Sequence, residues 1–166
     1  MSSDTYRFIL GLRAIRSYQP RPLEDSDLEA ILQAARWTGS SKNRQDWSFV
    51  VLTDPGHKEE LAACGDYTDP VRASAATIVL VQEPGGYEFD MGRAAQNIML
   101  AAKAIGVASC PITLHREEDA RLVVGAPEDR RTRYAVALGY PSEDAEPRRI
   151  GGRKALGAVV HTERYG

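Results

Sequence analysis

The order of helical and extended patterns along the chain predicts an α+β fold, with helices layered around a central sheet. Two observations carry this prediction. ATIVLVQ, at residues 76–82, is a near-continuous apolar run, which is typical of a strand covered on both faces. FDMGRAAQNIMLAAKAIG, at residues 89–106, is a long, alanine-rich stretch with apolar residues on one helical face. The patterns continue on both sides without a repeat or a long linker, so we expect a single domain over residues 1–166.

The first clear helix is expected over residues 22–39. Its apolar residues recur at helical spacing, and Ser26 and Glu29 have the S-x-x-E spacing of a capping box. Gly39 is a typical residue at the end of a helix. SFVVLT, at residues 48–53, is short, β-branched and aromatic, which predicts a strand after this helix.

The rest of the chain continues the alternation of strands and helices. Asp54 and Pro55 are a good N-cap and first residue for the next helix. In the long alanine-rich stretch, Asp90 is the expected N-cap and Gly106 the expected stop. Two further strands are predicted, in VASCP at residues 107–111 and in RYAVALG at residues 133–139. A short helix, REEDARLVV at residues 116–124, is expected between them.

Composition and charge exclude several classes of function. With 166 residues, of which 43% are hydrophobic and 27% charged, the chain can build a real core. A formal net charge of -2 gives no global reason to bind nucleic acid. No apolar run approaches the roughly 18 residues of a membrane span, and MSSDTYRF lacks the regions of a secretory signal. We therefore expect a cytoplasmic protein whose partner is a small molecule.

The cysteines and histidines carry no recognisable catalytic or metal-binding pattern. Cys64 and Cys110 are far apart in the sequence and fit no metal or redox spacing, so we interpret them as reduced thiols. His57, His115 and His161 belong to no motif, and we interpret them as surface or packing residues. No metal site is expected.

A polar connector, SSKNRQDW at residues 40–47, joins the first clear helix to the first strand. Ser40, Ser41 and Asn43 are ordinary turn formers, and Trp47 is an ordinary anchor at the start of a strand. The alternative is functional. A segment rich in amides and donors at a helix-to-strand junction can be presented by a rigid scaffold to a heterocycle.

Two basic clusters are candidates for binding an anion. LRAIRSYQP, at residues 12–20, is expected to end a helical N-terminal segment, with Arg13 and Arg16 on neighbouring turns of one face. Arginine suits bidentate phosphate contacts, although two solvated surface arginines fit the sequence equally well. RRIGGRKALG, at residues 148–157, is the second cluster, and its two glycines permit close backbone approach.

Five segments in this order resemble the FMN-dependent nitroreductase family over almost the whole chain. They are LRAIRSY, SSKNRQDWSFVVL, DMGRAAQNIMLAAKAIGVAS, VALGYP and GGRKALGAVVHTERYG. The resemblance implies a three-layer fold with a central mixed sheet flanked by helices. It also implies a homodimer with the flavin at the subunit interface. From charge and hydropathy we expect no nucleic-acid or membrane partner.

The resemblance also assigns roles to residues of this chain. It places the FMN phosphate on Arg13 and Arg16, with Ala14 between them, and brings Arg153 to the same phosphate, with Lys154 as a lesser candidate. It places the flavin ring and ribityl chain against the connector and the segment after VASC, where backbone amides face the redox nitrogen of the ring. The matched residues there are Ser41, Asn43, Gln45, Pro111 and Ile112.

The chain departs from the family pattern in three places. Leu12 and Ala14 stand where relatives often have a basic residue and a serine, which removes phosphate contacts. Thr113 and Leu114 stand where many relatives have an acidic residue and a glycine, so the electronic tuning of the flavin is expected to differ. Residues 64–75 are short by family standards, which favours an open and less selective site.

The activity that the resemblance implies is electron transfer from NADH or NADPH to nitroaromatics, quinones or similar acceptors by a ping-pong mechanism, with FMN as the cofactor. Two alternatives remain open. One is a specialised flavin enzyme of the same fold, such as a reductive dehalogenase, an enone reductase or a flavin-cleaving enzyme. The other is a flavin-binding protein without turnover.

Overall fold

A four-stranded sheet in the order β1-β2-β4-β3 forms the centre of the molecule. The computed structural model describes residues 3–147 and 152–165. The strands are β1 (Trp47–Leu52), β2 (Ala76–Gln82), β3 (Ala108–Thr113) and β4 (Arg131–Gly139). All three pairings between these strands are antiparallel, where a mixed sheet was expected. The α+β class and the central position of β2 are as predicted.

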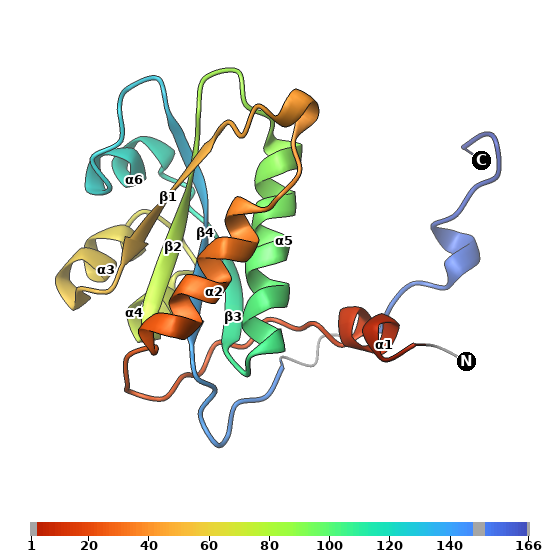
Figure 1. Ribbon diagram of the computed structural model, residues 1–166, viewed down its shortest axis with the longest axis horizontal. Helices are drawn as coiled ribbons and strands as arrows, with labels where there is room; N and C mark the ends of the chain where they lie inside the picture. The colour runs from red at the N-terminus through yellow and green to blue at the C-terminus, as the bar shows by residue number, and fades with distance from the viewer. Residues whose placement is uncertain (1–2, 148–151, 166) are drawn as a thin grey trace.

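Helices cover both faces of the sheet, which gives the expected three layers (Figure 1). On one face lie α2 (Asp25–Arg36) and α5 (Glu88–Ala104), which pack against each other and the sheet. On the other lie α3 (Pro55–Ala62), α4 (Asp69–Ala73) and α6 (Glu117–Val123). The short helix α4 has no counterpart among the sequence predictions.

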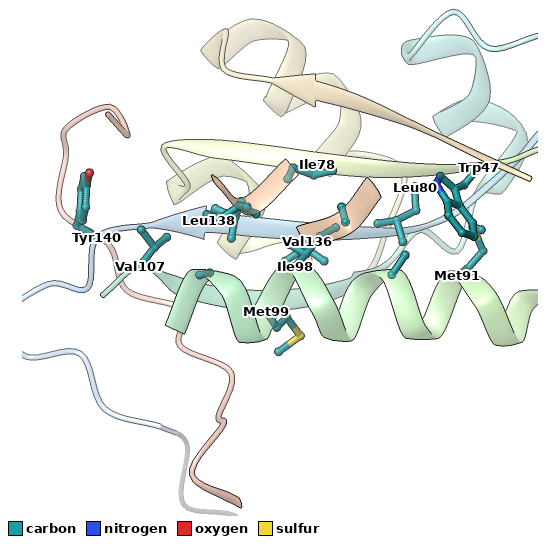
Figure 2. Close-up of a cluster of buried hydrophobic side chains, with 14 residues drawn as sticks. Trp47, Ile78, Leu80, Met91, Ile98, Met99, Val107, Val136, Leu138 and Tyr140 are labelled. Atoms are coloured by element: carbon teal, nitrogen blue, oxygen red, sulfur yellow. The ribbon is translucent and has the colours of Figure 1, made fainter. Parts of the chain in front are cut away.

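Alternate residues of each central strand face opposite layers. Ile78 and Leu80 of β2 belong to the core under α2 and α5, whereas Val79 belongs to the core under α3, α4 and α6. This double burial explains the continuous apolar run of β2. Figure 2 shows the first core, in which Ile98 of α5 and Val136 of β4 lie between the helix and the sheet.

The predicted capping box of α2 is wrong. The N-cap is Glu24, whose side chain makes no capping bond, and Ser26 lies inside the helix. The backbone N–H of Glu24 donates instead to the hydroxyl of Tyr140, at 3.2 Å, so a tertiary contact fixes the start of the helix. The helix also ends at Arg36, before Gly39. The prediction for α3 is confirmed, because Oδ1 of Asp54 accepts the N–H of His57 at 2.9 Å.

The start of α5 also differs from its prediction. The N-cap is Tyr87, and Asp90 lies in the first turn, where it is buried and paired with Arg93. The C-terminal end is close to the predicted one. Ile105 is the C-cap, and Gly106 follows with φ of +78°, in the left-handed region that glycine adopts without a Cβ clash.

The N-terminal helix ends earlier than the sequence predicted. Helix α1 (Asp4–Leu10) stops before the two arginines, and residues 12–17 are not helical. The reason is tertiary pairing. The N–H of Ile15 donates to the carbonyl of Ser109 at 2.9 Å, and the N–H of Gln19 donates to the carbonyl of Tyr140 at 2.8 Å. These bonds hold the segment in an open conformation across the end of the sheet.

The two ends of the described chain lie away from the sheet in Figure 1. Helix α1 has no buried residue, and residues 152–165, which include the short helix η2 (Leu156–Ala158), are exposed throughout. Both segments carry exposed apolar side chains, among them Ile9, Leu10 and Leu156. Across the described ranges, none of the helices has the length and apolar character needed to cross a membrane.

Candidate functional site

The polar loop at residues 40–46 is built from strained backbone. It contains the short helix η1 (Ser41–Asn43), and Lys42, Asn43 and Gln45 have φ of +53°, +54° and +55°. Asparagine tolerates such angles, but lysine and glutamine rarely adopt them, and Lys42 and Gln45 each cost about 1–2 kcal/mol. Backbone strain of this kind is kept where the surrounding structure holds it, often at binding sites.

Hydrogen bonds within the loop hold this conformation. Oγ of Ser40 accepts the N–H of Gln45 at 2.9 Å, and the carbonyl of Gln45 accepts the N–H of Trp47 at 2.7 Å. Trp47 itself is buried in the core, as predicted, at 9% exposure. Ser41, Asn43 and Gln45 are exposed, and Nε2 of Gln45 reaches only the carbonyl of Asn43, at 3.3 Å. The amide side chains of the loop are therefore accessible to a ligand.

Arg44 ties the loop to the turn that precedes α5. Its Nε lies 2.7 Å from Oδ2 of Asp46, and its Nη2 donates to the carbonyl of Gly85 at 2.7 Å. The carbonyl of Asp46 also accepts the N–H of Glu83, at 3.1 Å. Sequence reasoning did not assign Arg44 a role, because its partner at Gly85 is a backbone atom that no motif reveals.

The predicted phosphate arginines lie on the open segment between α1 and α2. Nη1 of Arg13 donates to the carbonyls of Leu10 and Leu12, at 2.8 and 2.7 Å, and so closes the end of α1. Arg16 is exposed, and no hydrogen bond or ion pair within the described ranges engages its guanidinium. Ala14 is half-buried against the core under α3, α4 and α6. Arg16 is therefore the better placed of the two to meet an anion.

Arg16 lies near the start of β3. Burial raises the pKa of Tyr18 far above its usual range, and the positive charge of Arg16 opposes that rise. Burial likewise raises the pKa of the Cys110 thiol, with Arg16 again opposing. The hydroxyl of Tyr18 donates to the carbonyl of Ile15 at 2.9 Å, and this bond helps to hold the segment in place. The neutral tyrosine and thiol leave the charge of Arg16 uncompensated.

A cavity of about 510 Å³ lies beside β3, between the sheet and the first half of α5. The predicted residues Pro111 and Ile112 both line it. Pro111 is exposed, and Ile112 is buried at 5% exposure. The other residues that line the cavity are Glu88, Phe89, Met91, Gly92, Ala95, Thr113, Tyr134 and Ala135. Mostly apolar walls with few polar groups suit a planar heterocycle such as the flavin ring.

Two of the predicted groups thus lie along one strand, whereas the third lies elsewhere. The arginine segment crosses the start of β3 at Ser109, and the cavity begins at Pro111 on the same strand. The loop at residues 40–46 precedes β1, at the edge of the sheet opposite β3 and at the other end of the sheet from Ser109. From three strand spacings and an offset of seven residues along the strands, the loop and the arginine segment are about 28 Å apart. No residue of the loop lines the cavity.

Within one chain, the C-terminal candidates Arg153 and Lys154 do not lie near the arginine segment, the cavity or the loop. Arg153 and Lys154 are exposed, in the segment that Figure 1 shows away from the sheet. The rest of that basic cluster, residues 148–151, falls outside the described residues. Sequence reasoning also missed Phe89 and Tyr134, which line the cavity. An aromatic residue next to the expected N-cap, Asp90, was the signal that the sequence offered for Phe89.

Comparisons with known proteins all point to one family. The sequence pattern of the nitroreductase family matches residues 9–84 and 73–140. A protein of Archaeoglobus fulgidus, provisionally described as an NADH dehydrogenase/NAD(P)H nitroreductase, is 30% identical over 154 residues, covering 86% of this chain and 88% of its own. The NADPH-flavin oxidoreductase of Vibrio harveyi is 27% identical and covers 98% of this chain and 75% of its own.

Solved structures give the same result. Nitroreductase A of Vibrio parahaemolyticus has a TM-score of 0.90 at 25% identity, covering 100% of this chain and 78% of its own. The NADPH:FMN oxidoreductase of Vibrio harveyi, in complex with NAD+, has a TM-score of 0.87 at 25% identity, covering 99% of this chain and 79% of its own.

Proposed function

Since this chain belongs to the nitroreductase family, it is an NAD(P)H-dependent oxidoreductase that uses FMN, and we propose that nitroaromatics, quinones or similar compounds accept the electrons by a ping-pong mechanism. The observation that carries the proposal is the apolar cavity beside β3, lined by Pro111 and Ile112, with Arg16 near the start of the same strand. When bound, FMN supplies the chemistry by taking a hydride from the nicotinamide and returning electrons to the acceptor.

The residues of this chain would bind and orient the cofactor. The guanidinium of Arg16, helped by Arg13, is free to bond the phosphate bidentately. The cavity walls hold the ring and exclude water, which strengthens polar contacts there. Thr113 and Leu114 bring no carboxylate beside the ring, so no acidic side chain at these positions opposes the negative charge of reduction.

The separation of the loop at residues 40–46 from the arginine segment supports a homodimer. The loop and the arginine segment lie at opposite corners of one sheet, and no residue of the loop lines the cavity beside β3. In this proposal a second copy, related by a two-fold axis, brings its loop and the arginine segment of the first copy to one flavin. Exposed apolar residues on α1 and the C-terminal segment, such as Ile9 and Leu156, favour the same conclusion, because they have no cover within the described chain. Arg153 and Lys154 would then approach a phosphate from that segment.

Anaerobic titration tests the enzymatic proposal. Purified protein reconstituted with FMN should be yellow and should bleach on addition of NADH or NADPH, and a quinone or nitroaromatic should restore the colour. Steady-state rates should give parallel double-reciprocal lines, as ping-pong kinetics require. Flavin that binds but does not bleach would indicate a binding protein without turnover. Bleached flavin that neither acceptor reoxidises would favour a specialised enzyme of the same fold.

Light scattering at several protein concentrations tests the dimer. We expect FMN affinity to fall on dilution through the dimer dissociation range, because each site needs two chains. A stable monomer saturated with FMN would contradict the interface site.

A further inference from the structure

A second cavity, of about 450 Å³, lies at the opposite end of the sheet from the loop at residues 40–46. It opens between the start of α2, the end of β1 and the α4-β2 junction. It shares no lining residue with the cavity beside β3. Its walls are mixed: Pro20, Pro22, Leu28 and Ala75 are among the apolar residues, and polar and charged side chains also line it.

The unusual feature of this cavity is a buried lysine. Lys58 lines it and is 6% exposed. Its Nζ donates to the carbonyl of Ser74, and an ammonium has two further N–H groups. Within the described ranges, no acceptor engages these two groups, and no carboxylate lies within ion-pair distance of Nζ. A buried cation without an anionic partner is costly, so an anion in the cavity would relieve it.

The other charged groups around the cavity limit the charge of its ligand. Asp25 lines the cavity and would repel a dianion. Asp54 is the N-cap of α3, and its negative charge raises the pKa of Lys58 on the same helix, against the lowering by burial. Arg21 also lines it, but its guanidinium stacks on the ring of Tyr140 at 3.5 Å and lies 3.9 Å from Glu24. Among the described residues, Lys58 is thus the one cation of the lining without an ion pair, and the nearby carboxylates disfavour a ligand with more than one negative charge.

The part of the lining formed by residues 19–22 is rigid. Pro20 and Pro22 have fixed φ angles, and hydrogen bonds hold the residues between and before them. The N–H of Gln19 donates to the carbonyl of Tyr140, and the N–H of Arg21 donates to the carbonyl of Gln19 at 2.9 Å. A preformed wall lowers the entropic penalty of binding.

We propose that this cavity is a binding site for a small monocarboxylate with an apolar body, such as an aromatic or short aliphatic acid. The carboxylate lies on Nζ of Lys58. The hydroxyl of Thr53, an exposed residue of the lining that makes no hydrogen bond within the described chain, is available as a second donor. The apolar body lies against the proline wall. This site is separate from the proposed flavin site and does not depend on it.

A purely structural role for Lys58 makes a different prediction. Ser74 is the C-cap of α4, and a lysine that bonds the last carbonyls of a helix stabilises that end. Such a role uses one N–H and requires no ligand. Lys103 provides a matched control, because its Nζ also donates to a backbone carbonyl, that of Phe8, at 2.7 Å, and it lies outside the cavity.

The first test is an NMR titration of the FMN-loaded protein with benzoate and with benzamide, its uncharged analogue. Benzoate should shift signals of Thr53 and Ala75 saturably at millimolar concentration, and benzamide should bind far more weakly. Lys58→Met should weaken benzoate binding by about 10- to 100-fold, the loss expected for a charge-assisted hydrogen bond, and Lys103→Met should not. Equal binding to wild type and Lys58→Met would overturn the proposal.

The second test needs no variant, and so remains decisive if Lys58→Met does not fold. The Cε–Hε signal of Lys58 in 13C-lysine-labelled protein reports its titration. Burial lowers the pKa of Lys58, and a bound carboxylate stabilises the charged amine, so benzoate should raise that pKa. Benzamide should leave it unchanged. A Lys58 pKa that is the same with and without saturating benzoate would refute the site.

Discussion

The loop at residues 40–46 and the segment at residues 12–17 are both proposed to bind one flavin, yet they are built in opposite ways. The loop has three residues other than glycine with positive φ, and it is held by side chains such as those of Ser40 and Arg44. The segment is held by backbone bonds to β3, and the guanidinium of Arg16 is left uncommitted. In the loop, side chains fix the backbone. In the segment, the backbone fixes the position of side chains.

This difference separates the parts of the flavin that each region is expected to sense. Long side chains on a pinned backbone suit a charged and mobile group, the phosphate. Exposed amides on a strained and rigid loop suit a planar ring that must be oriented. Substitutions in the segment should therefore discriminate between FMN and riboflavin, which lacks the phosphate, whereas substitutions in the loop should affect both ligands alike.

The largest effect is expected for Arg13→Ala combined with Arg16→Ala. Leu12 and Ala14 supply no basic or hydroxyl group, so removing both arginines leaves the segment without a phosphate ligand. FMN affinity should fall by more than about 100-fold, since each charge-assisted bond contributes roughly 1.5–3 kcal/mol. The protein should then purify largely free of flavin, as absorbance would show. If the variant retains FMN at micromolar concentration, the phosphate-binding role would have to be assigned to Arg153 and Lys154 instead.

Arg16→Ala alone should weaken FMN binding by about 10- to 100-fold and leave riboflavin binding nearly unchanged. Flavin fluorescence titrations measure both affinities. Arg36→Ala is the control, because Arg36 is an exposed arginine of α2 outside the proposed site. An equal loss for FMN and riboflavin would show that Arg16 supports the fold of the segment and does not bind the phosphate.

Asn43→Gly should weaken FMN and riboflavin binding equally, by about 3- to 10-fold, the range for one neutral hydrogen bond. Glycine is the appropriate replacement, because alanine at φ of +54° would add strain to the loss of the amide. The same fluorescence titrations give the result. Unchanged affinity for both ligands would leave Asn43 as a turn former only.

The smallest effect is expected for Lys42→Gly, which tests whether the loop is strained. Glycine relieves the clash at φ of +53° but adds entropy to the unfolded chain, so we expect a net gain in the free energy of unfolding of about 0.5–1 kcal/mol. Urea denaturation of the flavin-free protein measures it. Lys42→Ala is the matched control and should give no gain, because it retains Cβ. A gain of the same size for both variants would show that the strain is not the cause.

The sequence predicts elements whose patterns are local. The apolar run of β2 and the Asp54-Pro55 start of α3 were predicted correctly, because burial on both faces and a capping bond leave their marks on adjacent residues. The family resemblance also pointed to Pro111 and Ile112; both line the cavity, and their contact with FMN stays a prediction.

Features set by distant contacts could not be predicted in this way. The capping box of α2 failed because Tyr140 fixes the start of that helix from 116 positions away. The prediction of a helix that carries Arg13 and Arg16 was wrong, because the N–H of Ile15 donates to the carbonyl of Ser109. The clamp of Arg44 depends on the carbonyl of Gly85, and a backbone acceptor leaves no residue type by which to recognise it.

The pairing of the arginine segment with β3 and with Tyr140 also fixes an order of assembly. Ile15 and Gln19 bond residues that are synthesised about a hundred positions later. The long loop between the bonded residues must therefore close before the arginine segment is fixed, and contacts of such high sequence separation form slowly. During translation the two arginines leave the ribosome early but have no fixed position until the last strand has emerged. A nascent chain that is cut short before Tyr140 should therefore contain both arginines and still fail to retain FMN.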